Sequence, residues 1–183
     1  MNHTLLKRTL FFLMFIILFI PPVTANGLSL VTLKEVPSDF EFTPVTLDGT
    51  NQSALGGSGR IVIAQVLSLS LIEQWQVTVQ ASPLKQAGDS GRELPLHSLK
   101  LNKPISSDSQ VTIPGGPWMI DTDSPITIIQ GKTLLGLPRQ FVTDFGNHPF
   151  TLELDPGLEL LNPGQSSTKY ETTITWTLTT PVL

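Results

Sequence analysis

The stretch from Tyr170 to Leu178 reads Tyr-Glu-Thr-Thr-Ile-Thr-Trp-Thr-Leu. Successive side chains of a β-strand point to opposite faces, so this stretch as a strand has one apolar face and one threonine face. The apolar face carries Ile174, Trp176 and Leu178, with Tyr170 and Thr172 on the same side. The other face carries Glu171, Thr173, Thr175 and Thr177. We predict a strand that closes one wall of a hydrophobic core.

A second segment with the same pattern lies about a hundred residues earlier. Its apolar face carries Trp75, Val77 and Val79. Its polar face carries Gln74, Gln76, Thr78 and Gln80. Two strands that each bear a tryptophan on one face, and amides or hydroxyls on the other, are therefore expected in the same domain.

The rest of the chain reads as short apolar stretches separated by glycine and proline turns. No segment of ten or more residues shows helical periodicity with caps. The sequence therefore predicts an all-β fold, an antiparallel β-sandwich or a barrel-like Greek-key domain. Within it, residues 61–72 are expected to form a central buried strand, residues 50–60 a glycine-rich loop and residues 141–145 an irregular segment.

The first 25 residues have the organisation of a secretory signal peptide. Lys7 and Arg8 precede an uninterrupted apolar run from Leu10 to Ile20, and a small residue, Ala25, follows at the expected cleavage position. The apolar run is short for a membrane span, which makes an uncleaved anchor the lesser alternative. We expect cleavage after Ala25 and one mature domain, residues 26–183, that is secreted to the cell surface or cell wall and does not insert into a membrane.

The net charge and the cysteine content exclude several classes of partner and of catalytic chemistry. Without the signal peptide the chain has 9 basic and 15 acidic side chains, a net charge of −6. This balance argues against nucleic acid as a partner and against Coulombic attraction to wall phosphates or anionic lipids. The chain has no cysteine, which removes thiol catalysis and cysteine-bound metals. Binding to a polyanionic surface would therefore depend on neutral contacts.

No catalytic arrangement is evident in the sequence. Residues 88–91, Gly-Asp-Ser-Gly, resemble the nucleophile loop of trypsin-like proteases, but Arg92 replaces a glycine of that motif. The only histidine upstream of Ser90 is His3, inside the signal segment, so the required base is missing. We read the segment as a surface turn and expect no enzyme activity. A hydrolase remains an alternative only if the fold brings an acid pair into a cleft.

Metal and cofactor sites are also not expected. Asp121 and Asp123 are two residues apart and offer oxygen ligands, but the spacing of a calcium loop is absent, which favours a solvated turn. His97 and His148 have no partner at ligand spacing and are expected in surface loops. The glycines around Ser58 lack the ending of a phosphate-binding loop.

The two tryptophan segments, together with residues 42–50 (Phe-Thr-Pro-Val-Thr-Leu-Asp-Gly-Thr), resemble the WxL domain of Gram-positive bacterial surface proteins. The likeness extends from about Phe40 to Leu178, in the family's order, although Val77 stands where the first motif has leucine. The resemblance implies a small stand-alone member that binds peptidoglycan without covalent linkage. It also implies larger membrane-anchored proteins as partners.

Candidate wall-binding residues follow from the two motifs and their polar faces. They are Trp75, Val77, Trp176, Leu178, Gln74, Gln76, Thr175 and Thr177. A tryptophan on the apolar face of a strand is more often a core residue than a ligand contact. Two functions stay open at this point. The first is a secreted, non-catalytic protein that binds peptidoglycan, and the alternative is an interaction subunit held at the wall by a membrane-anchored protein.

Overall fold

The computed structural model describes residues 31–37, 40–45, 50–66, 73–88, 92–133, 137–155 and 169–180. Within these ranges the chain forms strands and no helix. The strands are β1 (Val31–Glu35), β2 (Gln52–Gly56), β3 (Arg60–Gln65), β4 (Gln74–Ala81), β5 (Lys85–Gln86), β6 (Leu99–Leu101), β7 (Val111–Thr112), β8 (Trp118–Met119), β9 (Ile126–Lys132), β10 (Arg139–Asp144), β11 (Phe150–Leu154), β12 (Tyr170–Glu171) and β13 (Ile174–Thr179).

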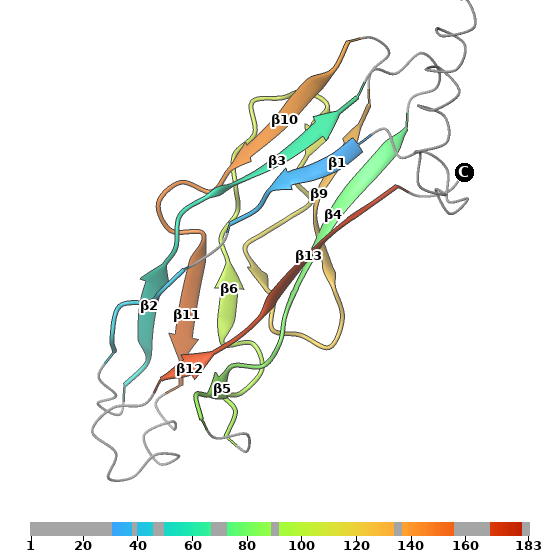
Figure 1. The fold of residues 1–183 in the computed structure, drawn as a ribbon. Coiled ribbons are helices and arrows are strands. Elements are labelled where there is room, and N and C mark those ends of the chain that lie inside the picture. The colour runs from blue at the N-terminus through green and yellow to red at the C-terminus, as the bar shows by residue number, and fades with distance from the viewer. Residues whose placement is uncertain are drawn as a thin grey trace, which may run out of the picture.

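The strands form four antiparallel sheets (Figure 1). One sheet has the order β13-β4-β9-β7 and is called the Trp sheet here, because β4 and β13 carry the two tryptophans of the motifs. A second has the order β1-β3-β10 and is called the covering sheet. The other two, β2-β11-β6-β8 and the small pair β12-β5, extend the molecule at its lower end in Figure 1.

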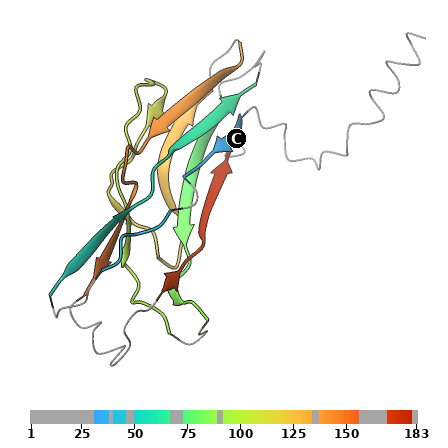
Figure 2. The ribbon, with the colours of Figure 1, turned by 60° about the vertical axis from the view of Figure 1, so that its left-hand side comes forward.

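The Trp sheet and the covering sheet pack face to face, as the two views of the ribbon show (Figure 2). The ring of Trp75 on β4 lies 5.2 Å from that of Phe141 on β10. At the edge of the Trp sheet that β13 forms, the ring of Trp176 lies 6.4 Å from that of Phe145. The fold is therefore an antiparallel β-sandwich, and its sheets remain open and do not close into a barrel.

The alternation predicted for the two tryptophan segments is confirmed, and the two strands are direct neighbours. In β4 the odd-numbered residues from Trp75 to Ala81 are buried, whereas the even-numbered ones are half-buried or exposed. Trp176 pairs with Val79 and Leu178 pairs with Val77, so the apolar faces of both strands point into the sandwich. The expected continuous last strand is interrupted at residues 172–173, which separate β12 from β13.

Two expectations about loops were wrong. Residues 50–60 contain β2, which pairs with β11, although glycines flank it. Residues 141–145 are largely strand, because β10 pairs with β3 over six positions. In both cases a partner distant in sequence supplies the ladder hydrogen bonds, and tertiary pairing of this kind overrides weak local propensity. The expected central strand is present as β3, where Ile61, Val62 and Ile63 are all buried, while residues 67–72 lie outside the described part.

The main contact inside the Trp sheet joins β4 and β9. Trp75 pairs with Gly131 in the register, and its indole covers the glycine. A Cβ atom built on Gly131 would lie 2.1 Å from Cζ2 of Trp75, so no side chain fits at this position. Trp75 is 1% exposed and stands among the largest fully buried side chains of the core. Glycine at 131 is therefore required by the space that the indole occupies.

We predict that Gly131→Val destabilises the fold by about 2 to 3 kcal/mol, because the new side chain must displace the indole in a packed core. Urea denaturation of the variant and the parent protein measures this difference. The neighbouring change Gln130→Ala is the control, since Gln130 is exposed and its loss should alter stability by less than about 0.5 kcal/mol. Equal stabilities of Gly131→Val and the parent would contradict the packing described.

Candidate functional site

The outward face of the Trp sheet is the most distinctive polar surface in the described chain. Its side chains are almost all amides and hydroxyls that the strand register places beside one another. They are Thr175, Thr177 and Thr179 on β13, Gln74, Gln76, Thr78 and Gln80 on β4, Thr127, Gln130 and Lys132 on β9, and Thr112 on β7. This set is called the outer face here.

One row of this face crosses all four strands. Gln76 pairs with Thr179 on one side and with Gln130 on the other, and Gln130 pairs with Thr112. Adjacent strands are about 4.8 Å apart, so the row spans roughly 15 Å of hydrogen-bonding groups. A second row joins Thr177, Thr78 and Thr127. The outer face therefore offers a regular array of neutral donors and acceptors.

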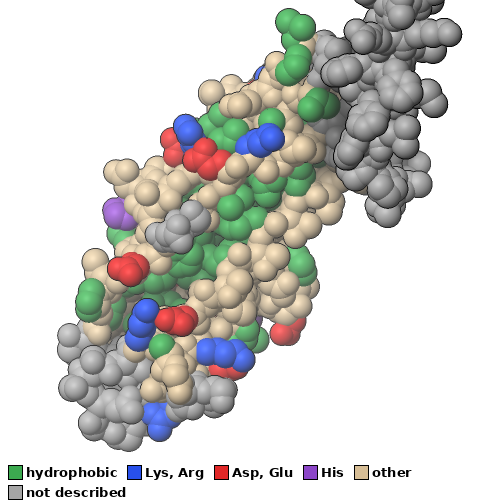
Figure 3. All heavy atoms as spheres, in the orientation of Figure 1, with side chains coloured by type: hydrophobic (Ala, Val, Ile, Leu, Met, Phe, Trp, Pro, Cys, Tyr) green, Lys and Arg blue, Asp and Glu red, His purple; other side chains and the backbone are tan. Residues whose placement is uncertain are grey.

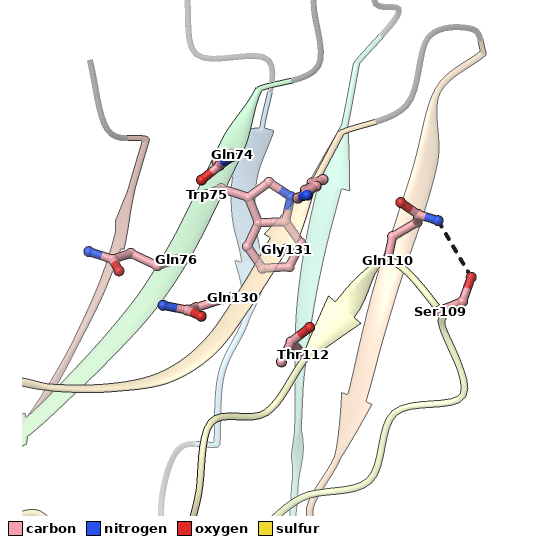
Figure 4. Close-up of a pocket in the computed structure, with 9 residues that line it drawn as sticks. Gln74, Trp75, Gln76, Ser109, Gln110, Thr112, Gln130 and Gly131 are labelled. Carbon is pink, nitrogen blue, oxygen red and sulfur yellow. Dashed lines mark hydrogen bonds between the residues drawn. The ribbon is translucent and has the colours of Figure 1, made fainter. Parts of the chain in front are cut away.

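A hollow of about 320 Å³ lies where this face meets the segment before β7. Its walls carry the amides of Gln74, Gln76, Gln110 and Gln130, the hydroxyls of Ser109 and Thr112, and the ammonium of Lys132. Figure 4 shows these side chains around the Trp75 and Gly131 pair, with a hydrogen bond of 3.5 Å from Nε2 of Gln110 to Oγ of Ser109. The hollow is therefore a shallow site that offers several amides and one cation.

The chemistry of these groups suits a ligand rich in hydroxyl and amide groups. A glutamine side chain both donates and accepts hydrogen bonds, as a threonine hydroxyl does, so each can match a sugar hydroxyl or a peptide group. Lys132 carries the only charge on the outer face as defined above. Gln80 is less available than the others, since its Nε2 donates to the carbonyl of Thr122 at 2.8 Å.

The structure divides the sequence-predicted site residues into two groups. Gln74, Gln76, Thr175 and Thr177 lie together on the outer face. Trp75, Val77, Trp176 and Leu178 lie on the opposite, core-facing side, where Trp75 and Val77 are fully buried and the two residues of β13 are half-buried. The tryptophan side chains therefore point away from the face that carries the polar residues, and only Trp75 also lines the hollow beside them among the described residues.

The indole of Trp75 is buried with its polar atom unpaired. Its Nε1 has no hydrogen-bond partner among the residues that the structure describes, which costs about 1 to 3 kcal/mol. Burial of a large side chain contributes about 1.5 to 3 kcal/mol, and the aromatic contact with Phe141 adds about 0.5 to 1.5 kcal/mol. At mid-range values the burial and the aromatic contact together outweigh the cost of the unpaired Nε1, so Trp75 acts as a packing residue.

Five polar residues that line the hollow were not predicted from sequence: Ser109, Gln110, Thr112, Gln130 and Lys132. The pattern around Gln130 is obscured because Ile128 and Ile129 are both buried, at a register shift between β9 and β4. Strand β7 has only two residues, too few to show alternation. The alternation of polar and apolar residues at positions 129–132 is a signal that could have predicted the outward direction of Gln130 and Lys132. In the structure these two exposed residues flank the buried Gly131.

The other candidate groups do not converge on one site. Asp121 is buried and not solvated as expected, because its Oδ2 accepts the backbone N–H of Ser98 at 2.8 Å, while Asp123 is exposed. His97 and His148 are exposed, in a turn and beside one. Among the described residues, no three histidine, aspartate or glutamate side chains are placed to hold a metal ion. The segment Asp89 to Gly91 lies outside the described residues.

No helix among the described residues is long and apolar enough to cross a membrane. Comparison with protein-family models, curated proteins and solved structures finds no match for this chain.

We predict that the two tryptophans differ in their contribution to stability. Trp75→Ala should cost about 3 to 5 kcal/mol, since it empties a fully buried site. Trp176→Ala should cost about 1 to 3 kcal/mol, since the half-exposed ring at the sheet edge loses less burial. Urea denaturation in dilute solution measures both values. The ranking is wrong if Trp176→Ala proves as destabilising as Trp75→Ala.

Proposed function

We propose that this protein is a secreted, non-catalytic surface protein that binds the bacterial cell wall non-covalently through the outer face of the Trp sheet. The ligand is peptidoglycan, whose sugar hydroxyls, acetamido groups and peptide bonds are neutral hydrogen-bonding groups. The single observation that carries the proposal is the row Thr179, Gln76, Gln130 and Thr112, which crosses four strands without a charge.

The electrostatics of the face agree with this ligand. The whole sequence has a formal net charge of −4, so a polyanionic wall repels the molecule at long range. A neutral face limits that repulsion at the contact surface. Lys132, on the wall of the hollow, is positioned to meet a carboxylate of the peptide part of the wall. Hydrogen bonds from an ammonium to a carboxylate are stronger than neutral ones, which makes this residue an orienting contact.

The resemblance to the WxL domain supports the same ligand and assigns the motifs a different part in binding. In this proposal the tryptophans hold β4, β9 and β13 in register, and the residues between them bind. The signal-like N-terminal segment supports export, and the resemblance implies a wall location. Wall binding is therefore a property of the outer face, and the Trp motifs contribute to it through the fold.

We predict that Gln76→Glu combined with Thr112→Glu abolishes binding to protein-stripped sacculi without unfolding the protein. Both positions flank Gln130 and are two strands apart, about 10 Å, so the new carboxylates repel the anionic wall more than each other. A pull-down with sacculi measures binding, and the melting temperature reports the fold.

A matched control adds two negative charges elsewhere. Gln140→Glu with Leu55→Glu alters exposed positions of β10 and β2, away from the Trp sheet, and should retain binding. If the control loses binding as completely as the outer-face variant, net charge and not the outer face explains the loss. If the outer-face variant binds like the parent protein, the proposed site is wrong.

Salt gives a second test, because neutral contacts are not screened. Between about 0.1 M and 1 M NaCl the Debye length falls from about 10 Å to about 3 Å, which removes most attraction between exposed charges. We expect the protein to stay on sacculi over this range, with Lys132→Gln showing a still smaller response to salt. Complete elution at moderate salt would show that a basic surface, and not the outer face, holds the protein.

A further inference from the structure

Strand β13 is an edge strand without the protection that edge strands usually have. It pairs with β4 on one side, and no other strand in the described residues pairs with its second side. Natural edges are commonly short, bulged, or interrupted by proline or lysine. The opposite edge of the Trp sheet, β7, has only two residues, whereas β13 has six regular ones.

The direction of the backbone groups shows what the free edge offers. The carbonyl of Thr173 accepts the N–H of Ser82 at 2.9 Å, and the register with β4 continues without a shift to Thr179. Hydrogen-bonded positions alternate along an antiparallel pair, so Thr175, Thr177 and Thr179 bond to β4. Residues Ile174, Trp176 and Leu178 therefore direct their N–H and C=O groups to the open side.

The same three residues are incompletely buried. Ile174, Trp176 and Leu178 are half-buried, although the β4 residues opposite them are almost fully buried. Figure 3 shows a band of hydrophobic atoms along the long axis of the molecule, beside the position that β13 has in Figure 1. An added strand at this edge would gain both backbone hydrogen bonds and apolar contacts.

The charge pattern is compatible with a second copy of the chain as the partner. The chain has a net negative charge, but residues 172–180 carry none, so two copies can meet here without facing charges. The nearest acidic group, Glu171, is paired with Lys169 at 3.0 Å, and this hydrogen bond raises the pKa of Lys169. An antiparallel arrangement places the two Glu171 residues at opposite ends of the paired strands.

We propose that β13 pairs with β13 of a second copy of this chain, antiparallel about a twofold axis at Trp176, to form one continuous eight-stranded sheet. In this register Ile174 lies opposite Leu178 of the second copy, and Thr175 lies opposite its Thr177. The ladder contributes about six hydrogen bonds between the copies. Threonine pairs on one face and aromatic or aliphatic pairs on the other are favourable cross-strand contacts. The two outer faces then form one surface.

Crosslinking tests the register. The chain has no cysteine, so introduced thiols report without background. Positions 175 and 177 form a non-hydrogen-bonded pair across the axis, in which the Cβ atoms are close enough for a disulfide. A mixture of Thr175→Cys and Thr177→Cys proteins should crosslink on mild oxidation, whereas each variant alone should crosslink much less. Crosslinking that is equally efficient in the separate variants would overturn the register.

Sedimentation equilibrium of the full chain tests the association itself. We expect a mass twice 20.0 kDa for the parent and a monomer for Leu178→Pro, because proline removes an edge N–H that β4 does not use. Leu178→Ala is the matched control, since it loses the side chain but keeps the donor and should still dimerise. All variants carry the same residues 1–30, so a difference in mass between the parent and Leu178→Pro is caused by β13 and not by that segment.

Two results would overturn the proposal. One is a parent chain that stays monomeric at every concentration, which would leave the edge to a strand of another protein. The other is a Leu178→Pro protein that dimerises as the parent does and has the same melting temperature. The wall-binding variant Gln76→Glu with Thr112→Glu changes β4 and β7 and leaves every residue of β13 unaltered, so it should still dimerise. Failure of this proposal and failure of wall binding are therefore distinguishable.

Discussion

The contact between the indole of Trp75 and the bare backbone of Gly131 is the constraint on which the Trp sheet depends. It joins β4 to β9 at the end of the sheet that carries the hollow, and it brings the indole within 5.2 Å of Phe141 on the covering sheet. A shift of one residue in either strand would remove the glycine from beneath the ring. Because strand side chains alternate with a period of two, such a shift would also turn the glutamines into the core. The register of the outer face and the packing of the core therefore depend on the same contact.

This dependence explains how buried motifs can support the binding surface proposed for the outer face. The tryptophans do not need to touch a ligand to be necessary for binding, since they determine which residues of β4 and β13 face outward. The hydrogen-bonding row from Thr179 to Thr112 exists only while all four strands keep their register. Loss of Trp75 would therefore remove the site indirectly, through the fold, whereas a change at Gln76 acts on the site alone.

Sequence patterns were sufficient for some parts of this arrangement and insufficient for others. Alternation in β4 and β13 predicted the faces of Gln76, Thr175 and their neighbours, because that signal is local. It could not predict that β4 lies between β13 and β9, since strand pairing depends on contacts across about a hundred residues of chain. Strands β2 and β10 were missed for the same reason, and Thr112 joins the site only because two-residue β7 pairs with β9. The need for glycine at position 131 could not be predicted either, because the indole that requires it belongs to another strand.

The position of Trp176 follows from the same alternation, with a different consequence. Trp75 is in an interior strand and is enclosed by β9 and the covering sheet, while Trp176 is in the last strand and is only half-buried. Within the described part of the chain, β13 is a regular, charge-free edge strand that combines unpaired backbone groups with incompletely buried apolar side chains. One added strand would remove both deficits. Residues 172–180 contain none of the lysines or prolines that commonly block pairing at an edge. If the protein binds the wall as proposed, pairing through β13 would join two outer faces, and two joined faces dissociate from a polymer more slowly than one.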